Sequence, residues 1–133
     1  TEVLSQNDFS PAACQGVVGI QARKEDIFAN LFKKINDLKT QTECKAERRV
    51  LKIINANCNS PISVVSKIIN DQIQIKVQLL NHTGETIFFK TYNDSVNKYE
   101  HLTDAIGNEI MSEVGEKQIE QLNNLENDFD YTP

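Results

Sequence analysis

The sequence lacks the features that would place it in a membrane or on a nucleic acid. No apolar run approaches the roughly 20 residues that cross a bilayer, and no signal peptide or membrane anchor is visible. Lys and Arg number 14 against 19 Asp and Glu, a net charge of −5. This balance argues against a nucleic-acid module, because neutralising phosphates needs clustered basic side chains. We therefore expect neither a membrane nor a nucleic acid as partner.

The sequence also lacks the cysteine spacing of a metal site or a disulfide scaffold. Its three cysteines, Cys14, Cys44 and Cys58, are odd in number and widely spaced, with no CxxC pair and no cluster around His82 or His101. This pattern is typical of reduced thiols in a cytoplasmic protein. We predict a cytoplasmic protein with no metal site.

What is present is an ordinary globular composition, with 39% hydrophobic and 25% charged residues among 133. That length suits one domain with a core, preceded by a short piece of another. The chain begins with Thr1, and its opening residues read like the middle of a domain. We expect a fragment of a longer polypeptide.

The first 38 residues predict a strand followed by a helix. The apolar run Gly16–Ala22 suits a buried strand, and Lys24–Asp37 has Ile27, Leu31 and Ile35 at helical spacing. A strand followed at once by a helix is half of a βα unit. We interpret residues 1–38 as the last strand and helix of an α/β domain.

Residues 39–133 predict a second domain with the order α-β-β-β-α. Leu38–Gln41 reads as a linker, and Thr42 is placed to cap the next helix. The expected elements are a helix over Glu43–Ile54, strands over Ile62–Ile69, Gln72–Leu80 and Glu85–Tyr92, a helix over about Lys98–Val114 and a short helix over Glu116–Leu125. Asn127–Pro133 is acidic and expected to fray.

Short connections between the three strands predict an antiparallel meander. In the last strand, Ile87 and Phe89 are expected to face inward. The fold class is thus α+β, with a three-stranded antiparallel sheet covered by helices on one face.

Cys58 lies in a polar loop between the predicted helix and the first strand of this domain. A free cysteine is more often a small buried apolar residue than a functional one. Its neighbours Asn55, Asn57, Asn59 and Ser60 favour an exposed thiol that could meet a ligand. From the residues alone, both interpretations remain open.

Two segments of the chain are similar to motifs of a known enzyme family. The run E-R-R-V-L-K-I-I-N-A-N-C-N-S-P-I-S, from Glu47 to Ser63, is similar to the family's cofactor-attachment signature, with Ala56-Asn57 in place of its usual Gly-Gly pair. Upstream, P-A-A-C-Q-G-V-V-G-I-Q-A-R, from Pro11 to Arg23, resembles a second family segment. The interval between the two motifs also fits, and together they make the chain resemble the porphobilinogen deaminase family, also called hydroxymethylbilane synthase.

The resemblance implies a transferase of tetrapyrrole (heme) biosynthesis. In this family the attachment cysteine, here Cys58, holds a dipyrromethane cofactor through a thioether. Four porphobilinogen molecules are joined head to tail with loss of ammonia, and the product is hydroxymethylbilane. A soft thiol sulfur suits the capture of an electrophilic pyrrolic carbon, which forms such a bond.

The resemblance also implies roles for other residues. Gln15 and Gly16 match family positions near the cofactor, and Glu47 and Arg48 are expected to support contacts between domains. Arg23 matches a family arginine and is grouped with them. The family's catalytic aspartate lies in its N-terminal domains, which this sequence does not contain. We therefore expect no catalytic residue here, an inactive chain when alone, and the N-terminal domains, porphobilinogen and the growing pyrrole chain as partners of a monomeric enzyme.

One alternative comes from another class of protein. The order α-β-β-β-α also occurs in double-stranded-RNA-binding domains, which would make the chain a non-catalytic binding module. The acidic balance and the lack of a Lys-rich helix start after the sheet count against it.

Overall fold

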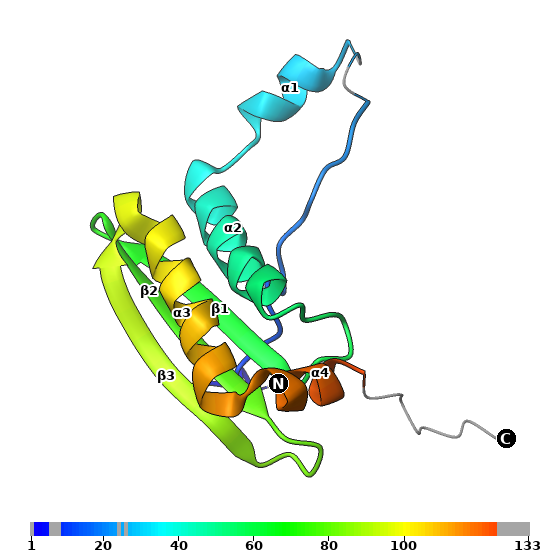
Figure 1. Cartoon of the computed structure of the whole chain (residues 1–133). Helices are drawn as coiled ribbons and strands as arrows, with labels where there is room; N and C mark the ends of the chain where they lie inside the picture. Colours follow the sequence, from blue (N-terminus) through cyan, green and yellow to red (C-terminus); the bar gives the residue numbers. More distant parts are fainter. Residues whose placement is uncertain (1, 6–8, 24, 26, 125–133) are drawn as a thin grey trace, which may run out of the picture.

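The computed structural model describes residues 2–5, 9–23, 25 and 27–124 (Figure 1). Its elements are α1 (Ala29–Lys34), α2 (Leu38–Ile53), β1 (Ile62–Ile69), β2 (Gln72–Leu80), β3 (Thr86–Ser95), a 3₁₀ turn (Val96–Lys98), α3 (Tyr99–Val114) and α4 (Glu116–Asn123). The three-stranded sheet with its helices confirms the α+β fold class. The predicted tail Asn127–Pro133 and the predicted last residue of the final helix, Leu125, lie outside the described residues.

The sheet is an antiparallel meander in the order β1-β2-β3. The bounds of β1 and β2 agree with the prediction. Asn70 and Asp71 join these strands with positive φ angles of 48° and 61°. A two-residue turn with this geometry matches the twist of the strands, so Ile69 pairs with Gln72 directly across it.

The third strand faces the core with a different residue from the one predicted. Phe88 is 4% exposed, whereas Phe89, expected inside, is 53% exposed. The cause is a register shift: Leu79 pairs with Phe88 and Leu80 pairs with Thr86, so one extra residue enters β3. A bulge of this kind reverses the faces beyond it.

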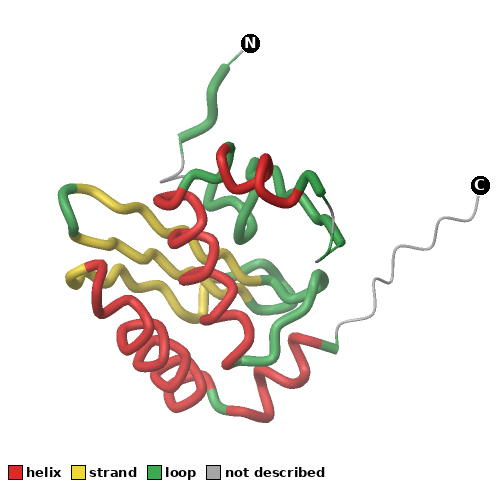
Figure 2. The backbone as a smooth tube through the Cα atoms, turned by 90° about the horizontal axis from the view of Figure 1, so that it is seen from above, coloured by secondary structure: helices red, strands yellow, loops and turns green. Residues whose placement is uncertain are grey.

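Helices α2 and α3 lie alongside each other on one face of the sheet (Figure 2). The core forms between them and the inward side of the strands, and its fully buried aliphatic side chains include Val50, Val64, Ile73, Ile75, Val77, Ile106 and Ile110. The helices approach closely where Gly107 of α3 meets Ile53 of α2. A Cβ at Gly107 would lie 2.5 Å from Cγ2 of Ile53.

The start of α2 differs from the prediction. The helix includes Leu38–Gln41, the expected linker, and its N-cap is Asp37 rather than Thr42. The Asp37 carboxylate accepts the Thr40 N–H over 2.7 Å, which satisfies one of the free donors of the first turn. Thr42 instead donates its hydroxyl to the Leu38 carbonyl over 2.9 Å.

The strand predicted over Gly16–Ala22 is wrong. These residues have no regular structure, and Val17, Val18 and Ile20 are 43%, 87% and 54% exposed. A strand needs a pairing partner, and the described strands pair only with one another. The helix predicted over Lys24–Asp37 is shorter, with only Ala29–Lys34 helical among its described residues. The proposed domain boundary after residue 38 stays a prediction.

No described helix is both long enough and apolar enough to span a membrane.

Candidate functional site

Cys58 lies in the loop that leaves the end of α2. Asn55 has a positive φ of 53°, and the Ala56 N–H donates to the Leu51 carbonyl over 2.9 Å. A left-handed residue with such a bond ends a helix and turns the chain away from it. The chain then reaches Pro61, just before β1, through Asn57–Ser60.

The Cys58 turn, residues 57–60, is closed by hydrogen bonds from its two ends. The Ser60 N–H donates to the Asn57 carbonyl over 3.2 Å, and the Asn57 N–H donates to the Ser60 hydroxyl oxygen over 2.8 Å. The Asn59 N–H also donates to Oδ1 of Asn57 over 2.8 Å. Cys58 is the second residue of this turn and is exposed. The local sequence therefore presents the thiol to solvent, which is the second of the two interpretations left open above.

Asn123, at the end of α4, contacts this loop, and sequence reasoning missed it. Its side chain donates to the Ile54 and Asn55 carbonyls over 2.9 and 3.0 Å and accepts the Ser60 hydroxyl over 2.6 Å. Its own carbonyl accepts from Nδ2 of Asn57 over 2.6 Å. The side chain of Asn57 thus ties the start of the loop's turn to the end of α4.

Gln15, Gly16 and Arg48 line one hollow along α2, which Cys58 does not line. Gly16 has a φ of +80°, a left-handed conformation that glycine adopts without strain. Arg23 is exposed and does not line this hollow. The structure thus brings Gln15, Gly16 and Arg48 together and leaves Cys58 and Arg23 apart from them.

Glu47 is buried and holds the N-terminal segment against β1. Its Oε2 accepts the Cys14 N–H over 2.6 Å, and its Oε1 accepts the Ser66 N–H and hydroxyl over 2.7 and 3.0 Å. The Ser63 hydroxyl also donates to the Pro11 carbonyl. These bonds place the segment before Gln15 on the helix and strand that flank the Cys58 turn.

The Cys14 thiol differs from that of Cys58 in its surroundings. Partial burial, and next the carboxylate of Glu47, raise the pKa of Cys14 to about 11. Its Sγ lies 3.8 Å from the Cys44 carbonyl oxygen. Thiolate is the reactive form, so Cys14 is poorly suited to covalent chemistry. Cys58 is the exposed cysteine of the three.

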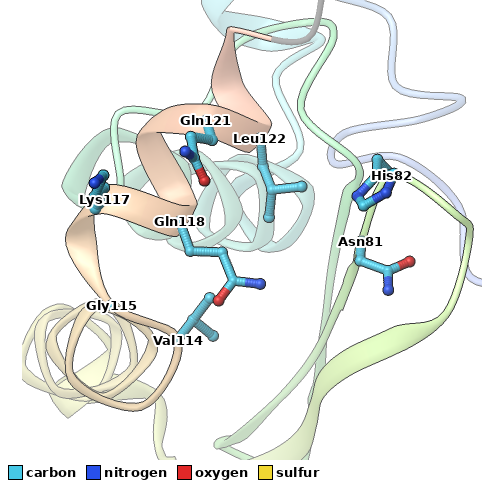
Figure 3. Close-up of a pocket in the computed structure, with 8 residues that line it drawn as sticks. All are labelled: Asn81, His82, Val114, Gly115, Lys117, Gln118, Gln121 and Leu122. Atoms are coloured by element: carbon cyan, nitrogen blue, oxygen red, sulfur yellow. The ribbon is translucent and has the colours of Figure 1, made fainter.

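A separate hollow of about 580 Å³ lies on another side of α4 (Figure 3). Gln118 and Leu122 of α4 line one side, and Asn81 and His82 of the connection between β2 and β3 line the other. No cluster of His, Cys, Asp or Glu able to hold a metal ion occurs in the described part of the chain.

A three-stranded sheet covered by helices, with an exposed cysteine between α2 and β1, defines an α+β domain that presents a cysteine to solvent. A family model described as porphobilinogen deaminase, C-terminal domain, matches residues 41–112, which is more than half of the chain. The chain therefore belongs to the porphobilinogen deaminase C-terminal domain family.

Curated relatives agree with this assignment. The chain is 26% identical to a porphobilinogen deaminase of Carboxydothermus hydrogenoformans over 92% of its own length and 40% of the relative's. It is 26% identical to a probable porphobilinogen deaminase of Thermoplasma volcanium, over 84% of its own length and 38% of the relative's. A porphobilinogen deaminase of Rickettsia bellii is 36% identical to the chain, over 67% of the chain's length and 30% of the relative's. The chain spans about two fifths of the length of the first two relatives.

Proposed function

We propose that the chain is the C-terminal, cofactor-attachment part of a hydroxymethylbilane synthase. The whole enzyme would condense four porphobilinogen molecules head to tail into hydroxymethylbilane with release of ammonia, as a transferase of tetrapyrrole biosynthesis in the cytoplasm. The observation that carries this proposal is the exposed Cys58 thiol on a hydrogen-bonded turn directly after α2. The family assignment supports it.

The Cys58 site fits a covalently held dipyrromethane. A thioether needs a sulfur that a pyrrolic methylene can approach, and Cys58 is exposed on a turn that the backbone and the Asn57 and Ser60 side chains close. When bound, the group would supply a primer that the enzyme retains between cycles. The turn itself would orient the sulfur, since its four residues are fixed at both ends.

Other residues of the chain would support the primer and the missing domains. From the resemblance we assign Gln15 and Gly16 to contacts with the cofactor or the growing pyrrole chain. They line the hollow along α2 beside Arg48, which Cys58 itself does not line. Arg48 is exposed, so its guanidinium can meet carboxylates of a partner domain. We assign Glu47, Arg48 and Arg23 to interdomain support, and for Glu47 the bonds to Cys14 and Ser66 favour this role.

The catalytic aspartate would come from the N-terminal domains of a monomeric enzyme, so the chain alone would be inactive. This is tested by expressing the chain together with the N-terminal part of the Carboxydothermus hydrogenoformans relative, the part that the chain does not cover. The relative's own C-terminal part, supplied in the same way, is the positive control. Porphobilinogen consumption is measured.

We expect consumption with both parts present, none with the chain alone, and none with Cys58→Ser. Turnover by the chain alone, or full turnover with Cys58→Ser, would contradict the proposal. Among the described residues, nothing specific favours the RNA-binding alternative over the family assignment.

A further inference from the structure

Asn123 is a buried polar residue on an otherwise amphipathic helix. It is 8% exposed, at the last position of α4, where Ile119 and Leu122 are 3% and 5% exposed and belong to the core. A buried amide is costly unless its donors and acceptor are satisfied. The residues that satisfy its amide therefore indicate which part of the structure Asn123 stabilises.

All side-chain partners of Asn123 belong to one segment, residues 54–60. Both hydrogens of its amide nitrogen are used, on the Ile54 and Asn55 carbonyls at 2.9 and 3.0 Å. Its Oδ1 accepts the Ser60 hydroxyl at 2.6 Å. The amide thus contacts the chain both before and after Cys58.

Ser60 connects Asn123 to the turn itself. The Ser60 oxygen donates to Asn123 and at the same time accepts the Asn57 N–H over 2.8 Å. The side chain of Asn57 in turn donates to the Asn123 carbonyl over 2.6 Å. The first and last residues of the Cys58 turn are therefore bonded to the same residue of α4.

We propose that Asn123 is a positioning residue that sets the conformation of the Cys58 turn. Because Ile119 and Leu122 fix α4 in the core, Asn123 transfers the rigidity of the core to an exposed loop. The meaning of this role for cofactor attachment rests on the proposed function, whereas the geometry of the turn does not.

The test compares Asn123→Ala with Asn124→Ala in the 133-residue chain. Asn124 is the adjacent residue, has the same side chain and is exposed, so it controls for a change of asparagine at the end of α4. Two rates are measured: hydrogen exchange of the Asn57, Asn59 and Ser60 amides, and alkylation of Cys58 by iodoacetamide. Exchange of the Ile75 amide in β2 reports on the core.

In Asn123→Ala we expect exchange at the turn to rise about fivefold, the effect of losing the one hydrogen bond that this side chain makes to the turn, at Ser60. Alkylation of Cys58 should rise with it. Exchange at Ile75 should stay within about twofold of the wild type, and Asn124→Ala should leave every rate unchanged. Equal turn exchange in the two variants would overturn the proposal, because a residue that only stabilises α4 does not act on the turn.

Ser60→Ala provides a second, milder variant. It removes the hydroxyl that joins Asn57 to Asn123, and it carries the test if Asn123→Ala does not fold. Because the Asn57 N–H then loses its own acceptor, exchange is compared at the Asn59 and Ser60 amides, whose acceptors are atoms of Asn57. Turn exchange should rise in Ser60→Ala, and in the double variant the two effects should be less than additive because both residues act on one network. No rise in turn exchange in Ser60→Ala, or full additivity, would overturn the proposal.

The hydrogen-exchange rates do not require cofactor attachment, and the alkylation rate is measured on chain whose Cys58 thiol is unmodified. If exchange at the turn rises in Asn123→Ala as expected, but no dipyrromethane is found on Cys58, the proposed function is refuted and the role of Asn123 stands. Attachment to Cys58 with no change of the turn in Asn123→Ala would refute the positioning role alone.

Discussion

The carboxylate of Glu47 accepts the backbone N–H of Cys14 over 2.6 Å, across 33 residues of sequence. The same carboxylate accepts two hydrogen bonds from Ser66 of β1. One buried side chain of α2 therefore joins the N-terminal segment to the sheet, at the helix that leads to Cys58. A change at Glu47 should consequently alter both the stability of the domain and the reactivity of the Cys14 thiol.

Glu47→Gln should destabilise the domain. Whichever oxygen becomes the amide NH2 faces an N–H donor, of Cys14 or of Ser66, and a buried donor then loses its acceptor. The expected loss is about 1–3 kcal/mol in the free energy of unfolding, measured by urea titration. Glu120→Gln on the exposed side of α4 is the matched control and should lose under about 0.5 kcal/mol. Equal losses in the two variants would show that the Glu47 contacts do not contribute to stability.

Cys58 should react with iodoacetamide before Cys14. Cys58 is exposed, whereas burial and the Glu47 carboxylate raise the pKa of Cys14 to about 11 and leave it almost entirely protonated at about pH 8. Peptide mass spectrometry over time should find Cys58 alkylated first and Cys14 far more slowly. In Glu47→Gln the Cys14 rate should increase, because one cause of the raised pKa is gone. Faster labelling of Cys14 than of Cys58 would contradict this account of both thiols.

Gly107→Ala should destabilise the packing of α3 on α2. The new Cβ would lie 2.5 Å from Cγ2 and 2.8 Å from Cβ of Ile53, so the helices must separate. Overpacking of this size costs about 1–3 kcal/mol, which thermal or urea unfolding would measure. Gly19→Ala is the control, since nothing lies within 4 Å of the position that its new methyl group would take. A Gly107→Ala protein as stable as Gly19→Ala would show that the two helices pack less closely than described.

The predictability of the fold depends on how local each signal is. The bounds of β1 and β2 follow from alternating apolar residues on either side of Asn70-Asp71, which are neighbours in sequence. The bulge that turns Phe88 inward depends on pairing with β2, and no property of β3 alone reveals it. The N-cap at Asp37 is a local signal, because its carboxylate bonds the backbone three residues later. The prediction missed it because the helical pattern of Lys24–Asp37 includes Asp37 as its last residue.

The site divides in the same way. The exposed turn at Cys58 is readable from its Asn and Ser neighbours, whose side chains bond the adjacent backbone. The role of Asn123 could not be predicted, because its bond to Ser60 joins residues 63 apart in sequence. The spacing of apolar residues along the chain carries no information on such a contact. The strand predicted over Gly16–Ala22 is wrong for the same reason. Whether an apolar run forms a strand depends on a pairing partner elsewhere in the sequence, which the run itself does not reveal.

The ion pair between Arg49 and Asp104 should contribute stability that acid removes. The guanidinium bonds both carboxylate oxygens at 2.8 and 2.9 Å, and hydrogen bonding to Arg49 lowers the pKa of Asp104 below its ordinary value of 3.8. The contribution is therefore fully present above pH 3.8 and is lost as the pH falls through the lower folded-state pKa.

Asp104→Asn tests this sign. Wild type should be more stable than the variant by a constant difference in the free energy of unfolding above about pH 5, and the difference should shrink below about pH 4. Urea unfolding across this range measures it. A difference that grows as the pH falls would mean that the pKa of Asp104 is raised instead.

The proposed function requires Cys58 to carry a dipyrromethane in the assembled enzyme. The most direct measurement is the intact mass of the chain after co-expression with the N-terminal part of the Carboxydothermus hydrogenoformans relative, followed by peptide mapping. The account predicts an added mass of dipyrromethane size on the peptide that contains Cys58, absent from Cys58→Ser. An unmodified Cys58 in a preparation where the relative's own C-terminal part becomes modified, or the same adduct in Cys58→Ser, would contradict it.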